Sequence, residues 1–315
     1  MRGGEGARSS LVVGTRGSPL ALWQAEWVQQ QLREIAPQLS VEVQRIKTSG
    51  DKILDVPLAK IGGKGLFVKE IEEALLRGEI DLAVHSMKDV PTALPDGLGI
   101  LCIPPRENPQ DVLVSRQGQT LEQLPTGARI GTSSLRRQAQ LLRRRPDFHI
   151  SMLRGNLDTR LRKVREGEFD AIVLAAAGLR RMGWVDQVTE YLAPEVSLPA
   201  IGQGALAIEG RTSDSFVRDL LQPLDDPPTR TAVTAERALL DRLEGGCQVP
   251  IGAHATITGD RLALDALIAS VDGRRVVRDR IEGPVSDARD LGLQLAERLL
   301  SQGGDEILKE IYGKA

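Results

Sequence analysis

Apolar and polar positions alternate in blocks that predict short strands, each followed by a turn and a helix. A short apolar run at 11–13 precedes "GTRGS" and then a segment whose apolar residues recur at helical spacing. Ser18 as N-cap and Pro19 at the first helical position mark where this helix begins. Strict alternation over 40–46 predicts a second strand, so the chain starts as an α/β protein.

The same layout returns further along the chain. Segment 128–145 passes from a strand through "GTSS" into a helix, and 147–168 gives another strand and helix. An apolar run at 169–183 ends in a basic turn. We expect two doubly wound, mostly parallel α/β halves of similar design, in which the glycine-containing stretch 48–65 forms a loop.

Beyond residue 223 the pattern changes. We expect a linker at 225–230, then a helix that stops at Gly245, then two strands joined at Asp272-Gly273. A last helix is expected to begin with Ser286 as its N-cap. This part of the chain is predicted to form a smaller α+β domain.

Length and charge limit the class of protein. A chain of 315 residues with 41% apolar and 27% charged residues predicts a globular protein of two or three domains. The formal charge of −2 argues against a nucleic-acid or membrane-surface binder, and 3% aromatics are too few for base stacking. No apolar run reaches the length of a membrane span, and the first residues lack a signal-peptide core.

The cysteines and histidines indicate neither a disulfide framework nor a metal site. Cys102 and Cys247 lie far apart in sequence, which fits a reducing compartment, and the three histidines show no metal-ligand spacing. We therefore expect a cytoplasmic protein without a metal. Cys102 sits in an apolar run typical of an inert buried thiol, whereas Cys247, in "EGGCQVP", has a loop context in which a reactive role is open.

The stretch "DLAVHSMKDVPT" at 81–92 is the first candidate for chemistry. Its apolar half reads as a strand, and ligands of doubly wound sheets bind beyond the carboxyl ends of strands. Ser86, Lys88 and Asp89 would then lie in a site, although a solvated turn would give the same pattern. His85 is expected to be a hydrogen-bonded histidine rather than a base.

Arginines are the second candidate. Arg136 and Arg137 follow "GTSS", where helix N-terminal amides already favour an anion. Arginines converging on one cleft repel one another unless an anion with several carboxylates or phosphates neutralises them. A solvated helix face is the alternative, and it is the expected state of 141–145. The other arginines just past predicted strands are Arg16, Arg154, Arg160 and Arg181.

Several stretches in one fixed order resemble the porphobilinogen deaminase family, also called hydroxymethylbilane synthase. They are "TRGSPLALWQA", "PLAKIGGKGLFVKEIE", "AVHSMKDVPT", "GTSSLRRQAQL", "RGNLDTRL", "LPAIGQGALAIE" and "AERALLDRLEGGCQVPIGA". The resemblance implies a transferase that condenses four porphobilinogen molecules with release of ammonia and yields the linear tetrapyrrole hydroxymethylbilane. It also implies a dipyrromethane cofactor bound covalently through Cys247, and nothing in it demands more than a monomer.

The fold that the resemblance implies has two domains like those of periplasmic binding proteins and a third α+β domain. The first domain is expected to be discontinuous, because "QGALAIEGR" would return the chain to it. The boundaries expected are 8–104 plus 204–222 for the first domain, 105–203 for the second and 227–315 for the third.

The resemblance also implies a role for each candidate residue. Asp89 is the expected catalytic group, because a carboxylate would stabilise the cation left when ammonia departs and could transfer its proton. Lys60 and Lys64 are expected on a mobile lid. Cofactor and growing chain are expected to be held by Lys88, Ser86, Thr132, Ser134, Arg136, Arg137, Arg154 and Arg160. Substrate is expected to face Arg16, Ser18, Arg181 and Gln203.

Two other classes of function stay open at this point. A non-catalytic two-lobed binding protein for a polycarboxylate would share the fold and the arginines, but it would have no use for Cys247 or Asp89. An RNA-binding function would depend on "LRRQAQLLRRR" alone, against the acidic balance of the chain. A Cys–His hydrolase has no support in the residue spacing.

Overall fold

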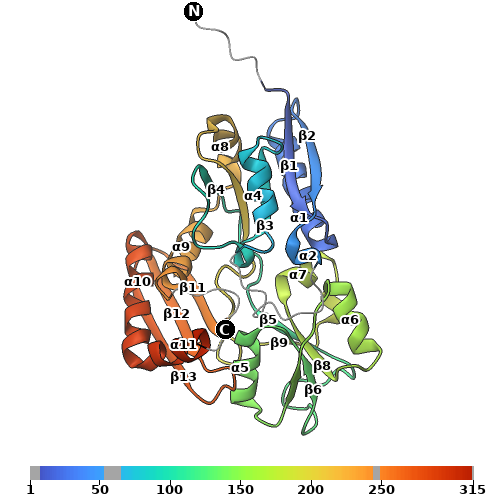
Figure 1. Cartoon of the computed structure of the whole chain (residues 1–315), viewed down its shortest axis with the longest axis vertical. Helices are drawn as coiled ribbons and strands as arrows, with labels where there is room; N and C mark the ends of the chain where they lie inside the picture. Colours follow the sequence, from blue (N-terminus) through green and yellow to red (C-terminus); the bar gives the residue numbers. More distant parts are fainter. Residues whose placement is uncertain (1–7, 53–64, 244–248, 314–315) are drawn as a thin grey trace, which may run out of the picture.

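The computed structural model describes residues 8–52, 65–243 and 249–313. Its strands form three separate sheets, each covered by its own helices, and in Figure 1 the first sheet lies above the second and third. Lys60, Lys64 and Cys247 fall outside the described residues, so their expected roles stay predictions.

The first sheet has the strand order β2-β1-β3-β10-β4. Strands β1, β2 and β3 run parallel, and β10 is antiparallel to both of its neighbours, so β4 runs in the same direction as the first three. The sheet is therefore mostly parallel, as expected, with β10 as its one reversed strand. The strands are β1 (Ser10–Arg16), β2 (Ser40–Ile46), β3 (Leu82–Ser86), β4 (Leu98–Cys102) and β10 (Leu206–Arg211). The return of the chain through β10 confirms that the first lobe is built from two segments.

Helices cover both faces of this sheet, as a doubly wound arrangement requires. Apolar residues of α1 and α8 pack on one face and those of α4 on the other. The N-cap Ser18 accepts a hydrogen bond from the amide of Ala21 at 3.3 Å, which confirms the predicted start of α1. These helices are α1 (Pro19–Ile35), α2 (Ser49–Lys52), α4 (Lys69–Leu76) and α8 (Ser215–Leu221).

The second sheet repeats the first with the order β7-β6-β8-β5-β9. Again three strands run parallel, and one strand, β5, is antiparallel to both of its neighbours. The strands are β5 (Asp111–Ser115), β6 (Arg129–Gly131), β7 (His149–Ser151), β8 (Ala171–Ala175) and β9 (Glu190–Tyr191). The helices are α5 (Leu135–Arg144), α6 (Leu157–Arg165) and α7 (Ala176–Arg181). The predicted similarity of the two halves is therefore confirmed, but Arg181 ends a short helix rather than a turn.

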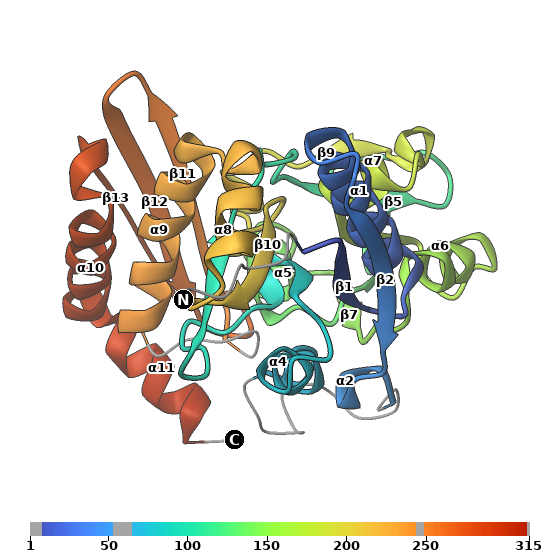
Figure 2. The same cartoon turned by 90° about the horizontal axis from the view of Figure 1, so that it is seen from above.

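The third sheet is antiparallel, with the order β11-β12-β13. Helices α9 and α10 pack against each other and against this sheet (Figure 2). The strands are β11 (Ile251–Thr258), β12 (Arg261–Ala269) and β13 (Val276–Pro284), and the helices are α9 (Pro227–Arg242), α10 (Ala288–Leu299) and α11 (Asp305–Tyr312). The hairpin at Asp272-Gly273 is confirmed, whereas the sequence analysis did not predict β11 or α11.

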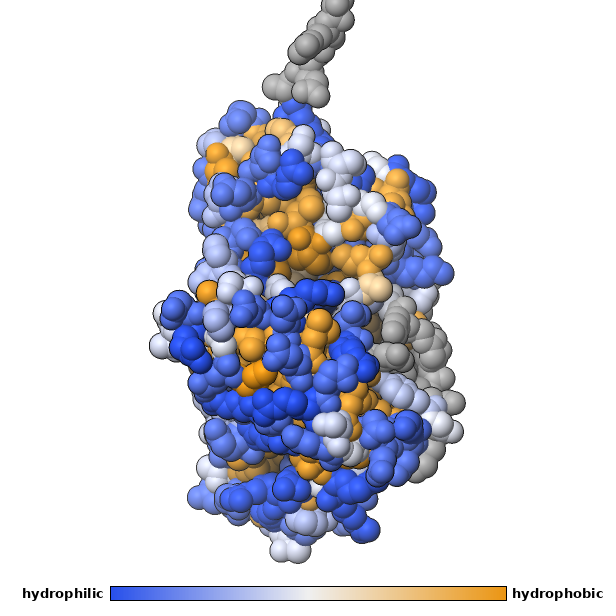
Figure 3. Space-filling view, turned by 90° about the vertical axis from the view of Figure 1, so that its left-hand side faces the viewer, coloured by the Kyte–Doolittle hydropathy of each residue, from blue (hydrophilic) through white to orange (hydrophobic). Residues whose placement is uncertain are grey.

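Two boundaries in this domain differ from the prediction. Residues 227–230 belong to α9 rather than to a linker, because Asp226 accepts the amide of Thr229 at 2.9 Å and caps the helix in front of its two prolines. Ser286 does not cap α10. Its hydroxyl donates to Asp287 at 2.8 Å, and Asp287 is the residue at the N-cap position. On the face that carries α8, α9 and α10, hydrophilic residues surround smaller hydrophobic areas (Figure 3).

The two connections between the first and second lobes run side by side. The amide of Glu107 donates to the carbonyl of Gly204 at 3.2 Å. Gly204 has φ +90°, and a Cβ there would lie 2.2 Å from the carbonyl oxygen of Glu107, so only glycine fits. From the third domain, Glu236 binds Arg106 at 2.6 Å and the amide of Gly202 at 2.7 Å, one residue from each connection. This buried carboxylate therefore ties the third domain to both connections.

Candidate active site between the two lobes

The end of β3 places three of the predicted residues. After Ser86 the chain makes one 3₁₀ turn, Met87–Asp89, fixed by the amide of Met87 on the carbonyl of Ala205 at 3.0 Å. Met87 is buried, whereas Ser86, Lys88 and Asp89 are half-buried. The apolar part of the stretch is thus a core strand, and the polar part lies at its carboxyl end.

Asp89 shares a small pocket with residues from β1 and α1. Arg16 stacks on Phe67, with its guanidinium carbon 4.1 Å from the ring centroid. The amide of Gln24 donates to Ser86 Oγ at 3.0 Å. The predicted residues that line this pocket are Arg16, Ser18, Ser86 and Asp89. Sequence reasoning missed Gln24 and Phe67, whose positions depend on the packing of α1 and α4 against β3.

Asp111, at the start of β5, organises the arginines of the second lobe. It is fully buried and accepts Arg136 Nη1 on one oxygen and Arg137 Nη2 on the other, both at 2.7 Å. Ser197 Oγ donates to it at 2.6 Å and Gln203 Nε2 at 2.9 Å. Burial alone would raise the pKa of Asp111, but attraction to the two arginines and their hydrogen bonds lowers it well below its usual range.

This arrangement changes the positions expected for two candidate residues. Arg136 is 4% exposed, and its Nη1 also donates to the carbonyl of Leu198 at 2.6 Å. Gln203 is 1% exposed, with its amide nitrogen on Asp111 and on the carbonyl of Pro109 at 2.6 Å. Both side chains are buried against Asp111, so a direct contact of either with a ligand stays a prediction.

The start of α5 holds Arg137 in place. Ser134 is the N-cap and accepts the amide of Arg137 at 3.4 Å, and Thr132 Oγ1 accepts the amide of Ser134 at 3.1 Å. Arg137 also donates to the carbonyl of Val173 at 3.0 Å. The hydroxyl of Ser134 therefore caps α5, a role that the sequence analysis did not assign to it.

Charges from the two lobes act on one another. Burial is the main cause that lowers the pKa of Lys88, and Arg137 and Arg160 lower it further, while Asp89 and Asp111 oppose them. Burial also lowers the pKa of Arg160 to about 10, with Arg137 and Arg154 adding to the effect and Asp89 opposing it. The structure thus brings Lys88 and Asp89 of the first lobe close to the arginines of the second.

Arg181 lies at the connection between the lobes. Its Nη2 donates to the carbonyl of Gly204 at 2.7 Å. Burial lowers the pKa of Arg181 to about 10, while Glu107 raises it. Its side chain is half-buried, and its contact with substrate stays a prediction.

Glu72 and Glu209 are two buried acidic residues close to His85, which lines the Asp89 pocket. His85 Nε2 is 3.1 Å from Glu209 Oε2, which confirms the expectation of a hydrogen-bonded histidine. Glu72 is 8% exposed and Glu209 is fully buried. The pKa of Glu72 is raised to about 7, mainly by burial and also by the charge of Glu209, while His85 opposes the shift. Cys102 is also fully buried, and burial raises its pKa to about 12, as expected of an inert thiol.

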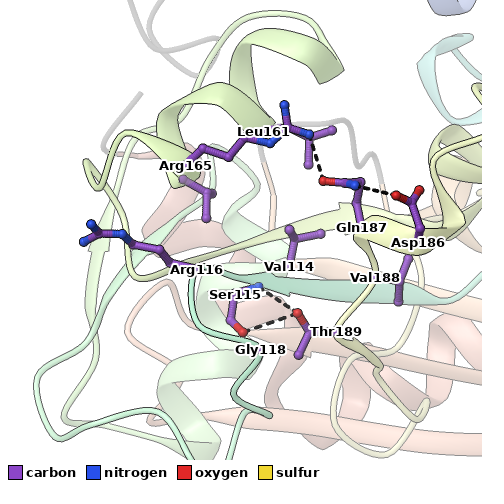
Figure 4. Close-up of a pocket in the computed structure, with 11 residues that line it drawn as sticks. Val114, Ser115, Arg116, Gly118, Leu161, Arg165, Asp186, Gln187, Val188 and Thr189 are labelled. Carbon is purple, nitrogen blue, oxygen red and sulfur yellow. Dashed lines mark hydrogen bonds between the residues drawn. The ribbon is translucent and has the colours of Figure 1, made fainter.

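A second hollow lies on the second lobe and contains none of the predicted residues. It is lined by α6, β5 and the segment 186–189 (Figure 4). Its polar groups largely bond to one another, since Arg165 donates to Gln187 at 2.8 Å and the amide of Ser115 to Thr189 at 3.0 Å.

Within the described ranges, no cluster of His, Cys, Asp and Glu could hold a metal ion. None of the helices described is long and apolar enough to cross a membrane.

The fold and this site define a two-lobed α/β protein with a cationic site between the lobes and a carboxylate at one strand end. Comparison with known families gives two matches, "Porphobilinogen deaminase, dipyromethane cofactor binding domain" over residues 11–219 and "Porphobilinogen deaminase, C-terminal domain" over residues 230–301. The chain belongs to the porphobilinogen deaminase family, as the sequence motifs indicated.

Curated relatives agree with these matches. Porphobilinogen deaminase of Geobacter sulfurreducens is 60% identical over 97% of this chain and 96% of its own length. That of Syntrophotalea carbinolica is 61% identical over 95% of each chain. Among solved structures, the periplasmic VFT2 domain of Bordetella pertussis BvgS is 17% identical, with a TM-score of 0.41 over 68% of this chain and 86% of that domain.

The residues described fit a cofactor that carries several carboxylates. Arg137 and Arg154 both lie close enough to Arg160 to lower its pKa, and Lys88 approaches Arg137 and Arg160 from the first lobe. Asp111, which contributes one negative charge against Arg136 and Arg137, leaves the cluster with an excess of positive charge. A polycarboxylate placed in the cleft would offset this excess.

The buried acidic residues Glu72 and Glu209 predict a specific pH dependence of stability. Glu72 keeps its proton in the folded state up to a pH of about 7, while the unfolded chain releases it near 4.5. The free energy of unfolding should therefore fall as the pH rises through this window, by up to about 3 kcal/mol. Urea unfolding of the wild type and of Glu72→Gln at pH 5 to 8 should show the difference between them change across the window.

The exposed Glu79, which pairs with Arg77 at 2.6 Å, supplies the control. Glu79→Gln should differ from the wild type by a constant amount over the same pH range. If the Glu72→Gln variant also ran parallel to the wild type from pH 5 to 8, Glu72 would not hold a proton in the folded protein.

Proposed function

We propose that this chain is a hydroxymethylbilane synthase that condenses four porphobilinogen molecules head to tail with release of ammonia. Water then releases the linear tetrapyrrole. The observation that carries the proposal is the position of Asp89, which lies in the pocket with Arg16 and Ser18 and also affects the charge of Arg160 in the other lobe. A carboxylate between a substrate pocket and a polycationic cleft suits a reaction of anionic pyrroles.

Asp89 would stabilise the positive charge that develops on the substrate. Loss of ammonia from the aminomethyl group leaves a methylene-pyrrole cation, and a fixed carboxylate beside it is worth roughly 3–4 kcal/mol by comparison with other preorganised charges. The same carboxylate can deliver a proton to the leaving amine and accept one from the attacking ring carbon. The anchored turn Met87–Asp89 holds it at the strand end.

The dipyrromethane, when bound through Cys247, supplies the pyrrole carbon to which the first substrate is joined. We assign its carboxylates to Lys88, Arg137, Arg154 and Arg160, with Ser86, Thr132 and Ser134 as nearby hydroxyls. Porphobilinogen has no aldehyde or ketone group, so an ionic role fits Lys88 better than a Schiff base. Arg136, Arg137 and Gln203 are all buried against Asp111, so burial does not separate them, and we keep Arg136 with the cofactor and Gln203 with the substrate.

The incoming substrate would bind in the small pocket. Its acetate and propionate groups suit Arg16, whose guanidinium is oriented by Phe67, and the hydroxyl of Ser18 at the N-terminus of α1. Arg181 would approach from the second lobe. Lys60 and Lys64 remain assigned to a lid. We further propose that the protein acts as a monomer in the cytoplasm.

The first prediction concerns the cofactor. Intact-mass measurement of the wild type, purified after exposure to substrate, should exceed the sequence mass by one dipyrromethane. Cys247→Ser should abolish the increment, because a hydroxyl is a poorer nucleophile than a thiolate. Cys102→Ser should keep it, since Cys102 is buried in the core. A wild type of bare sequence mass would contradict the proposal.

The second prediction concerns catalysis. Asp89→Asn should fold and retain the cofactor mass, yet turn over porphobilinogen roughly 100-fold more slowly or worse, because the charge opposite the cation is lost. Asp96→Asn, at an exposed position after the same strand, is the matched control and should keep full activity. Turnover of Asp89→Asn equal to that of the control would remove Asp89 from the catalytic role.

A further inference from the structure

Arg237 on α9 contacts the segment that follows Asp89. Its Nη1 donates to the carbonyl of Val90 at 3.0 Å, and its Nη2 donates to the carbonyls of Pro91 at 2.6 Å and Thr92 at 3.4 Å. These are the next three residues of the chain after Asp89. A side chain of the third domain thus binds backbone of the first lobe directly beside its catalytic group.

The segment after Asp89 is also held by Val90, which is buried in an apolar cluster with Met87 and Val233 and whose amide donates to the carbonyl of Met87 at 3.1 Å. It belongs to no helix or strand, and Pro91 has no amide hydrogen to donate. On the other side, the turn is anchored where the amide of Met87 donates to Ala205 in the first lobe. The backbone around Asp89 is therefore held from two directions, by the first lobe before it and by Arg237 after it.

The helix that carries Arg237 is itself fixed. The preceding residue, Glu236, is fully buried and binds Arg106 with both oxygens, at 2.6 and 3.1 Å. It also accepts the amide of Ala255 at 2.8 Å from β11. Glu236 thereby joins α9 both to its own sheet and to the connection between the lobes, so Arg237 projects from a rigid support.

A guanidinium suits this position better than another side chain. Its planar fork reaches three carbonyl oxygens at once, whereas an ammonium group has one nitrogen to share among them. Burial lowers the pKa of Arg237, while Asp241 and Glu209 raise it. The group remains charged at neutral pH, and charged donors form the stronger hydrogen bonds to carbonyls.

We propose that Arg237 is a positioning residue for the reaction, which sets the location of the Asp89 carboxylate relative to the group attached at Cys247. Helix α9 ends at Arg242, shortly before Cys247 in the sequence, so one helix links the cofactor-bearing segment to the backbone of the catalytic group. The inference rests on the proposed function. Arg237 is expected to act on turnover rather than on substrate affinity, because Arg16 and Ser18 belong to other elements.

The test compares Arg237→Gln, Arg237→Lys and the control Arg242→Gln by steady-state kinetics on the cofactor-loaded proteins. Arg242 lies on the same helix, is exposed, and pairs with Glu297 of the same domain at 2.5 Å. Arg237→Gln should keep its cofactor mass and a KM within about threefold of the wild type, but lose kcat by about tenfold or more, because small displacements of a reacting group are costly. Arg237→Lys should recover part of this loss, and Arg242→Gln should match the wild type.

Several results would overturn the inference. They are an undiminished kcat in Arg237→Gln, a raised KM with unchanged kcat, loss of the cofactor mass, or a Lys variant no better than the Gln variant. If Arg237→Gln did not fold, Arg237→Lys would decide alone, and wild-type kcat in that variant would count against positioning. A wild type without turnover would instead contradict the proposed function itself.

Discussion

The buried carboxylate of Asp111 is the interaction on which the site depends. Two guanidiniums side by side at the start of α5 would repel each other in a low-dielectric interior, and Asp111 holds both by accepting one on each oxygen. Ser197 and Gln203 complete its hydrogen bonds, while the two arginines still exceed Asp111 by one positive charge. The side chain of Arg137 is therefore held in place by contacts within the protein, without a ligand.

Glu236 is a second buried carboxylate, and it fixes the position of the third domain as Asp111 fixes the arginines of the second lobe. It joins α9 to Arg106 and to the amide of Gly202, on the two connections that pass between the lobes. With Gly204 allowing these connections to lie against each other, the three domains meet around one region. The proposed function requires this meeting, because the proposed catalytic Asp89, the arginines of the second lobe and the proposed attachment residue Cys247 each belong to a different domain.

Much of the fold could be predicted from the chain alone because its signals are local. The helix start at Ser18 and the strand at 40–46 depend on neighbouring residues, and the structure confirms both. The role of Asp111 could not be predicted, because its partners come from positions far away in sequence, with Gln203 in the connection that leaves the second lobe. The arginine pair did signal a need for negative charge, and part of that charge comes from the protein itself. Ser286 was misplaced because Val285–Asp287 form a 3₁₀ turn in front of α10, which moves the N-cap position to Asp287.

Sequence reasoning correctly placed Ser86, Lys88 and Asp89 at the end of a strand, since an apolar strand followed by polar groups is a local pattern. It did not reveal Phe67 and Gln24, which reach the pocket only through the packing of helices. The same limit applies to Arg237, whose acceptors lie in a different domain.

The most direct test of this account is the free energy of unfolding of Asp111→Asn, measured in urea beside Glu122→Gln. Glu122 is exposed and pairs at 2.8 Å with Arg144, which lies on α5 together with Arg136 and Arg137. Loss of this exposed pair should lower the free energy of unfolding by less than about 1 kcal/mol. Asp111→Asn should cost about 3–5 kcal/mol, because two buried guanidiniums lose their counter-charge. Equal losses in the two variants would show that Asp111 does not hold Arg136 and Arg137 together.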